Sequence, residues 1–326
     1  MKKVLFVVFL ILGTVIGSGF STGKEVAVFF SRFGVYSFFF IPLCFVLFYF
    51  VFYLLMTKGR ERLKTNKKSK LLSILMLVCA TIFSTAMFAG VENCVVEIPL
   101  VLKIVLFALI FAICFFACFK ELKFLSVINL ALIPALLIIL LGFFVFKLPN
   151  SSFVRVNSPN VAAGLFGGGF FCLLYVVLNI SLSSVVIAKA GEGLTKKQTK
   201  LACFLSAFVL SVFILIINVL VVCNFDLVNS AMPLLAMSEG VSTILLRFVI
   251  MVGCLTTLLS MIFVASSCCR DFSMSGRLIF FFCAILPFLL GKVGFGFIVS
   301  FLYPFASYLG VAILFMLFFG KLSRRR

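Results

Sequence analysis

Histidine and tryptophan are both missing from this 326-residue chain, and acidic residues are scarce, with 9 Asp and Glu against 28 Lys and Arg. Without histidine, the Ser/His/Asp and Cys/His catalytic arrangements and every His-ligated metal site are excluded. No pair of aspartates falls within an apolar segment either, so few groups are left for catalysis inside a membrane. We therefore expect a protein that is not an enzyme.

The composition is that of a membrane protein, with 64% hydrophobic residues and a mean hydropathy of +1.35. The N-terminal MKKVLFVVFLIL resembles a secretory signal peptide, because a short apolar stretch follows a basic start. A signal peptide would precede a domain of soluble composition, whereas apolar stretches recur here from end to end. We expect one all-α polytopic domain in a lipid bilayer, with phenylalanine and tyrosine as its aromatic belt.

Hydropathy predicts about ten membrane-spanning helices. They cover residues 4–30, 35–56, 71–91, 99–119, 124–146, 162–188, 201–223, 241–267, 278–290 and 295–319.

Basic residues occur in alternate connections between these spans. They are Lys2 and Lys3, the run KGRERLKTNKKSK at 58–70, Lys120 and Lys123, Lys189 with Lys196, Lys197 and Lys200, Arg270 with Arg277, and the terminal KLSRRR. The opposite connections hold the acids Glu92, Glu97, Asp226 and Glu239. The positive-inside rule then predicts a bacterial plasma-membrane protein with both termini in the cytoplasm. Topology accounts for the net charge of +19, so we expect no nucleic-acid partner.

The first span is interrupted by GTVIGSGFSTGKE at residues 13–25. Its central glycines, Gly17 and Gly19, lie about 20 Å along a helix from Lys3, near the bilayer centre. Each glycine costs about 1 kcal/mol relative to alanine in a helix, so we expect a break there. Five spans followed by five of opposite orientation predict an inverted repeat, with halves at about 1–146 and 160–320 and an interrupted first helix in each.

The sixth span carries two features, a cluster of four glycines and a polar residue at depth. Gly164, Gly167, Gly168 and Gly169 lie in its outer half, where close helix packing is the favoured interpretation. Asn179 is costly inside a membrane unless it bonds a partner. We therefore expect the second break near Tyr175 to Asn179.

The eighth span contains GCLTTLLS at residues 253–260, with Thr256 and Thr257 near the bilayer centre. Two interpretations stay open. The hydroxyls can bond the carbonyl one turn back in their own helix. Alternatively, together with carbonyls freed at a helix break, they supply the oxygen ligands that a hard cation such as sodium prefers.

The motif GTVIGSGFSTGKE, followed by a short apolar stretch and FF, resembles the first helix of the YkvI-type bacterial membrane proteins, whose pattern is roughly GxxxGxGFxSGxE. Those proteins are similar in turn to the amino acid, polyamine and organocation transporter superfamily. The resemblance implies the leucine-transporter (LeuT) type fold, with two inverted five-helix repeats and broken first and sixth helices.

The resemblance also implies site residues. A sodium site would fall on Gly13, Ile16, Gly253, Thr256 and Thr257. The substrate carboxylate would meet the backbone amides of Ser18 and Gly19, beside Gly17, where a half-helix begins. Tyr175 and Asn179 would face the substrate from the sixth span. Ser84, with Thr81 and Thr85, would do so from the third, although a packing role for these three is equally open.

One departure from the superfamily concerns gating. Sodium-coupled relatives close an outer gate with an ion pair between the first and tenth helices, whereas the tenth span here has no acid. Lys24 and Glu25 are the charges nearest the break. Glu25 is either a proton-coupling site or, as we favour, the partner of Arg32 in a structural ion pair at the outer surface.

Two classes of function remain. The favoured one is a secondary active transporter, of symporter type, for a small amino acid or related organic solute, driven by sodium or protons through alternating access. The alternative is a ligand sensor resembling the membrane subunits of spore germinant receptors. The longest connections have only about fifteen residues and offer no docking domain for partner subunits, which favours the transporter.

Overall fold

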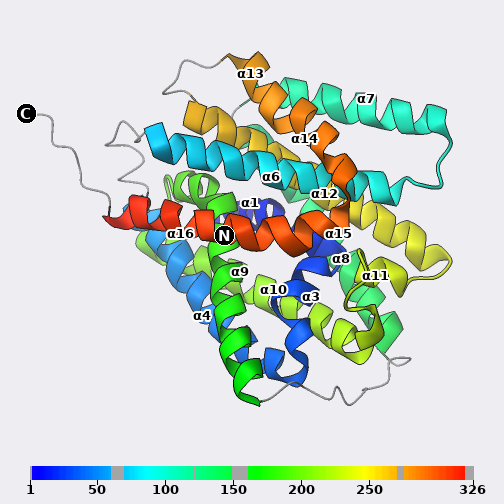
Figure 1. Ribbon diagram of the computed structural model, residues 1–326. Helices are drawn as coiled ribbons and strands as arrows, with labels where there is room; N and C mark the ends of the chain where they lie inside the picture. The colour runs from blue at the N-terminus through cyan, green and yellow to red at the C-terminus, as the bar shows by residue number, and fades with distance from the viewer. Residues whose placement is uncertain (1, 60–69, 121, 149–160, 270–274, 320–326) are drawn as a thin grey trace, which may run out of the picture.

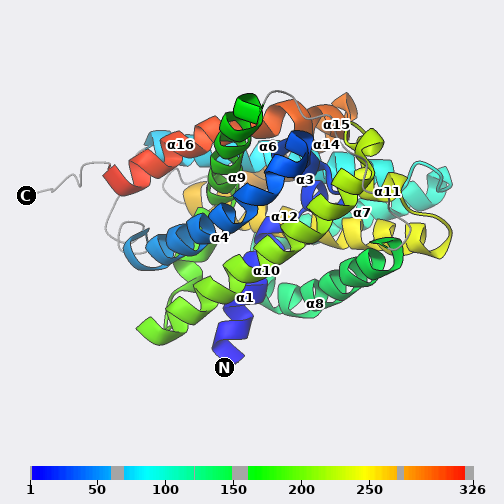
Figure 2. The ribbon, with the colours of Figure 1, turned by 90° about the horizontal axis from the view of Figure 1, so that it is seen from below.

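The computed structural model describes residues 2–59, 70–120, 122–148, 161–269 and 275–319. Those residues form helices and short connections, without a strand, packed into one bundle (Figures 1 and 2). Nine helices in these ranges are long and apolar enough to cross a membrane, which makes this a multi-pass membrane protein.

All ten predicted spans are confirmed as helical, and the first is divided into short pieces that individually cannot cross a membrane. Spans two to five are η1 (Ser31–Tyr36), α4 (Ser37–Leu54) and η2 (Leu55–Gly59); α6 (Lys70–Cys94); α7 (Leu100–Ala117); and α8 (Leu122–Lys147). Spans six to eight are α9 (Val161–Ala190), α10 (Lys196–Cys223) and α12 (Val241–Cys269), with the short η4 (Phe225–Leu227) and α11 (Pro233–Ala236) between the last two. Span nine comprises α13 (Gly276–Phe280), η6 (Phe281–Ile285), α14 (Leu286–Leu290) and η7 (Gly291–Val293), and span ten comprises α15 (Phe295–Phe297), η8 (Ile298–Leu302) and α16 (Tyr303–Phe319).

The predicted break in the first span is confirmed. Helix α1 (Lys2–Val15) ends where Gly17 adopts an extended conformation, and its N–H donates to the carbonyl of Val15 at 3.0 Å instead of the carbonyl one turn back. Helix α2 (Ser18–Ser21) then runs for a single turn. A second interruption precedes α3 (Lys24–Phe29), because Gly23 has a φ of 78°, a conformation that favours glycine.

The predicted break in the sixth span is wrong, because α9 runs without interruption from Val161 to Ala190. Polar side chains around the expected break bond to their own helix. Asn179 donates from Nδ2 to the carbonyl of Tyr175 at 2.9 Å, and Ser181 donates to the carbonyl of Leu178 at 2.6 Å. Asn179 therefore meets its need for a partner inside a regular helix, and no break is required.

The glycine cluster of α9 serves packing, as predicted. A Cβ on Gly164 would lie 2.6 Å from the ring of Tyr36, and one on Gly167 would lie 2.8 Å from the ring of Phe33. A Cβ on Gly168 would overlap the ring of Phe40. The glycines thus let the aromatic residues around the start of α4 pack directly against the backbone of α9.

The broken first helix lies in the centre of the bundle. Helix α1 contacts α8, α9, α10 and α12, and in Figure 2 it lies between α8 and α10. In the most apolar 18-residue stretch of α12, 83% is buried. In that of α7, which lies at the rim in Figure 1, only 11% is buried. Helix α12 therefore lies in the interior, where it contacts α1 and α2, while α7 faces lipid.

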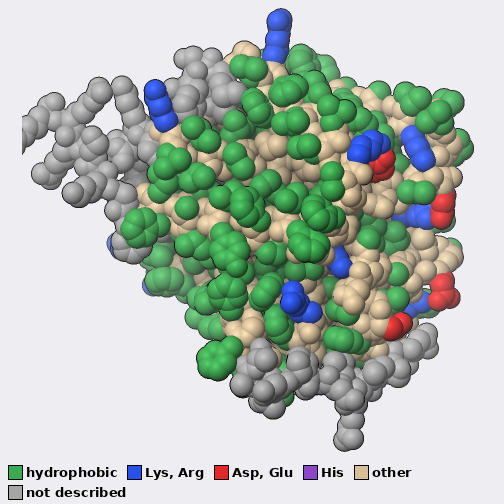
Figure 3. Space-filling view, viewed as in Figure 1, with side chains coloured by type: hydrophobic (Ala, Val, Ile, Leu, Met, Phe, Trp, Pro, Cys, Tyr) green, Lys and Arg blue, Asp and Glu red, His purple; other side chains and the backbone are tan. Residues whose placement is uncertain are grey.

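Three ion pairs of the described residues lie at one end of the bundle. Glu92 pairs with Lys292, Glu97 pairs with Arg247 at 2.7 Å, and Glu239 pairs with Lys147 at 3.5 Å. On the face seen in Figure 3, the acids lie together along one edge, next to lysine and arginine side chains, and hydrophobic side chains cover most of the remainder. Most of the predicted cytoplasmic basic run at 58–70, Arg270 and the terminal arginines lie outside the described residues.

Candidate functional site

The break in the first helix meets α12 at the predicted threonine motif. Thr257 Oγ1 donates to the carbonyl oxygen of Gly13 at 3.5 Å, and Ser260 Oγ donates to Thr14 Oγ1 at 3.1 Å. A Cβ on Gly253 would lie 3.3 Å from the carbonyl oxygens of both Ile16 and Gly17. Glycine at position 253 therefore lets α12 approach the carbonyls at the break.

The five residues predicted for a cation site lie together in the fold, but their hydroxyls differ. Thr257 reaches across to α1, whereas Thr256 Oγ1 donates to the carbonyls of Val252 and Gly253 within its own helix, each at 3.1 Å. Both side chains are buried. The structure thus brings the Thr257 hydroxyl to the Gly13 carbonyl and the Gly253 backbone close to the carbonyls of Ile16 and Gly17, whereas the Thr256 hydroxyl stays within its own helix.

Asn129 of α8 adjoins the same region and was missed by the sequence analysis. Its Nδ2 donates to the carbonyl of Leu10 at 3.4 Å, and its Oδ1 is buried with no hydrogen-bond partner among the described residues. The signal was present, because an asparagine in an apolar run is expensive unless it has a structural or functional partner.

The half-helix α2 packs against α6. The Ser18 N–H donates to the thioether sulfur of Met87 at 3.4 Å, and Ser18 Oγ donates to the carbonyl of Ala86 at 3.3 Å. Ser84, one turn earlier on α6, has a buried hydroxyl without a partner among the described residues. Thr81 and Thr85 donate to carbonyls one turn back in α6, at 3.0 and 2.8 Å, in keeping with a packing role.

Glu25 lies inside the bundle, and its predicted pairing with Arg32 is wrong. Its side chain folds back over Gly19, where a Cβ would overlap the carboxyl group, and the residue is only 4% exposed. Arg32 instead stacks on the Phe171 ring, with 4.6 Å from its guanidinium carbon to the centroid. The aromatic rings around α9 attract the guanidinium and hold it at the surface, away from the buried acid. Lys24 points elsewhere and donates from Nζ to the carbonyl of Asn229 at 3.2 Å.

Two tyrosines lie near the Glu25 carboxyl. Tyr175 of α9 and Tyr303 of α16 both interact with it electrostatically, and both hydroxyls are buried without reaching hydrogen-bond geometry with a described residue. Tyr175 is held by the rings of Phe29 and Phe30, with centroids 5.4 and 5.2 Å away. The sequence analysis singled out Tyr175 and missed Tyr303, which no polar motif marks.

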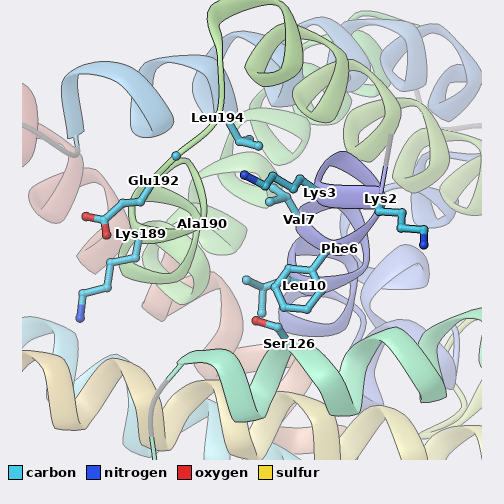
Figure 4. Close-up of a pocket in the computed structure, with 11 residues that line it drawn as sticks. Lys2, Lys3, Phe6, Val7, Leu10, Ser126, Lys189, Ala190, Glu192 and Leu194 are labelled. Carbon is cyan, nitrogen blue, oxygen red and sulfur yellow. The ribbon is translucent and has the colours of Figure 1, made fainter.

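A cavity of about 510 Å³ opens beside the start of α1 (Figure 4). Its lining residues are Lys2, Lys3, Phe6, Val7, Leu10, Ser126, Lys189, Ala190, Glu192, Gly193 and Leu194. In Figure 4, Lys189 and Glu192 lie on one side of it and Lys2 and Lys3 on the other. Two lining residues, Leu10 and Ser126, are each one turn before a residue next to the break, Thr14 and Asn129.

No family model matches the sequence, and no curated protein matches it. The fold is similar to that in the crystal structure of a manganese transporter from Eremococcus coleocola, solved with an aromatic bis-isothiourea compound. The TM-score is 0.61 at 11% identity, over 96% of this chain and 76% of that chain. The chain thus shares the fold of a membrane transporter. Within the described ranges, no three Cys, Asp or Glu side chains form a group that could hold a metal ion.

Proposed function

We propose that the protein is a secondary active transporter of a small amino acid or related organic solute in the bacterial plasma membrane, with both termini in the cytoplasm. The observation that carries this proposal is the helix break at Ile16 and Gly17, which lies in the centre of a bundle with a transporter fold. A break at membrane depth is tolerated where its free backbone groups line a protein interior or a binding site.

The proposed coupling ion is sodium, bound by the carbonyls of Gly13, Ile16 and Gly253 and the hydroxyls of Thr256 and Thr257. The close approach of Gly253 to the Ile16 carbonyl and the reach of Thr257 to Gly13 support this assignment. Oxygen ligands suit a hard cation, and uncharged ones suit a monovalent ion that must also be released.

The proposed substrate site lies on the other side of the break, at Gly17, Ser18 and Gly19, with Ser84, Tyr175 and Asn179 around it. The Ser18 N–H donates to a thioether sulfur, which is a weak acceptor. A substrate carboxylate would be a much stronger acceptor for the same N–H.

We further propose one domain of two inverted repeats, at about 1–146 and 160–320. Corresponding helices of the two halves pack against each other, since α4 contacts α10 and α6 contacts α12. The cavity beside Lys2 and Lys189 is the proposed cytoplasmic vestibule, and alternating access would open and close the way from it to the break.

The test is counterflow of radiolabelled amino acids in proteoliposomes, with and without a sodium gradient. We expect exchange of at least one amino acid, and we expect an inward sodium gradient to increase it. Exchange that responds to pH and not to sodium would support transport but show that the coupling ion is a proton and not sodium. Binding without any flux would contradict transport and favour the sensor.

A further inference from the structure

Glu25 is a buried acid that the proposed sodium and carboxylate sites leave unused. It is 4% exposed, and no Lys or Arg of the described residues lies within ion-pairing distance of its carboxyl group. Its neighbour Lys24 is engaged by the carbonyl of Asn229, and Arg32 by the rings of Phe33 and Phe171. A carboxylate inside a membrane protein is energetically costly without a positive partner. A positively charged ligand bound next to Glu25 would supply that partner.

The groups around this carboxyl share one chemistry. The hydroxyl oxygens of Tyr175 and Tyr303 are buried, lie near the carboxyl on two different helices and have no hydrogen-bond partner among the described residues. Phe83 packs edge-on against Tyr303, with ring centroids 5.0 Å apart, and Phe29 and Phe30 pack against Tyr175. These rings fix both hydroxyls in place. One carboxylate and two phenol oxygens form an acceptor set that suits an ammonium group, which has three N–H donors.

We propose that Glu25, Tyr175 and Tyr303 bind the positively charged amino group of the transported solute. The solute is then an amine or a zwitterionic amino acid, and a simple carboxylic acid is excluded. The Glu25 side chain contacts Gly19, the residue after Ser18, so a carboxylate at the Ser18 N–H and an amino group at Glu25 would be close enough to belong to one small molecule. The inference rests on the proposed function and names the charge of its substrate.

The experiment measures binding to the purified full chain in detergent, by the rise in melting temperature and by titration. The probes are the twenty common amino acids, followed by the decarboxylated amine and the deaminated acid of whichever amino acid binds. We expect the wild type to bind the amino acid and its amine, and the deaminated acid at least tenfold more weakly. Glu25→Gln should weaken binding of the amine at least about tenfold, because it removes one partner of a buried charge pair.

Tyr175→Phe and Tyr303→Phe keep the rings and remove the hydroxyls, so each should weaken amine binding about tenfold, which is the usual effect of losing a hydrogen bond to a charged group. The matched controls are Tyr308→Phe, on the exposed face of α16, and Glu239→Gln, at the exposed end of the bundle; both should bind as the wild type does. The two tyrosine variants keep the inference testable should Glu25→Gln fail to fold.

A deaminated acid that binds as tightly as its amino acid would overturn the assignment, and so would amine binding that is unchanged in Glu25→Gln and both tyrosine variants. A protein that binds no amine and no amino acid would overturn it as well. Flux separates this inference from the proposed function. Uptake of uncharged or anionic solutes would support transport and contradict the ammonium site. Tight, Glu25-dependent amine binding without flux would support the ammonium site and contradict transport.

Discussion

The side-chain amide of Asn129 occupies the space that a Cβ at position 13 would need, since such an atom would lie 2.5 Å from Asn129 Cγ. Helices α1 and α8 are therefore in contact through a glycine and an asparagine immediately below the break. The same amide donates to the Leu10 carbonyl at 3.4 Å, which ties α8 to the last full turns of α1.

This contact predicts a mutual suppression. Gly13→Ala alone should lower the melting temperature, because the added methyl group forces the Asn129 amide from its place, at a cost of about 1–3 kcal/mol. In the double variant with Asn129→Ala, the methyl group has room. The two changes should therefore destabilise the protein less together than the sum of the single changes, with a coupling energy of about 0.5–3 kcal/mol. Additive effects in thermal unfolding of the four proteins would contradict the contact.

The sequence predicted the spans and the first break well, because both depend on local signals. Long apolar stretches define membrane helices, and glycines at the bilayer centre cost energy that a regular helix does not repay. The motif GTVIGSGFSTGKE itself indicates a helix break, and Thr256 and Thr257, shortly after Gly253, indicate polar groups at membrane depth. The resemblance implied that these two motifs meet, and in the structure Thr257 does contact the Gly13 carbonyl.

Predictions from the sequence were wrong or missing where a side chain can interact either with its own helix or with a distant partner. Asn179 was expected to mark a break, yet its amide satisfies the Tyr175 carbonyl within α9. Arg32 was expected beside Glu25, yet it stacks on Phe171, which only the packing of α9 brings close. Tyr303 lies far along the chain from Glu25, and no pattern in the apolar sequence of α16 shows that its hydroxyl faces inwards. These choices depend on tertiary contacts.

Gly19 provides a second prediction. Gly19→Ala is compatible with a helical backbone, so its main effect should be to displace the Glu25 carboxyl, which occupies the place of the new methyl group. We expect the protein to be inserted in the membrane and purified as a monodisperse species, with ligand binding reduced at least tenfold. The control is Gly142→Ala on α8, where a Cβ meets nothing within 4 Å. Normal binding by Gly19→Ala would place the ligand away from α2.

The third prediction concerns the cation. Thr257→Val keeps the shape and removes the hydroxyl that reaches Gly13, so the sodium concentration for half-maximal uptake should rise about tenfold. Thr256→Val should also raise it, because the proposed site uses that hydroxyl as well. The control is Thr81→Val, which removes an intrahelical bond to Leu77 on α6 and should leave the sodium response unchanged. Unshifted sodium curves for both α12 variants would reject the site.

The last prediction concerns the attachment of the segment after α3 to α10. Asn218 of α10 accepts from Ser31 Oγ at Oδ1 and donates from Nδ2 to Ser37 Oγ, each at 2.8 Å, so one amide holds both ends of η1. Asn218→Ala should remove both bonds and leave a small cavity beside two buried hydroxyls, which should lower the free energy of unfolding by about 2 kcal/mol. The measurement is thermal or denaturant-induced unfolding in detergent. Asn93→Ala is the matched control, because Asn93 is exposed and bonds only one turn back, to Ala89, and its loss should change stability by less than about 0.5 kcal/mol. Equal stability losses in the two variants would mean that Asn218 does not hold the segment in place.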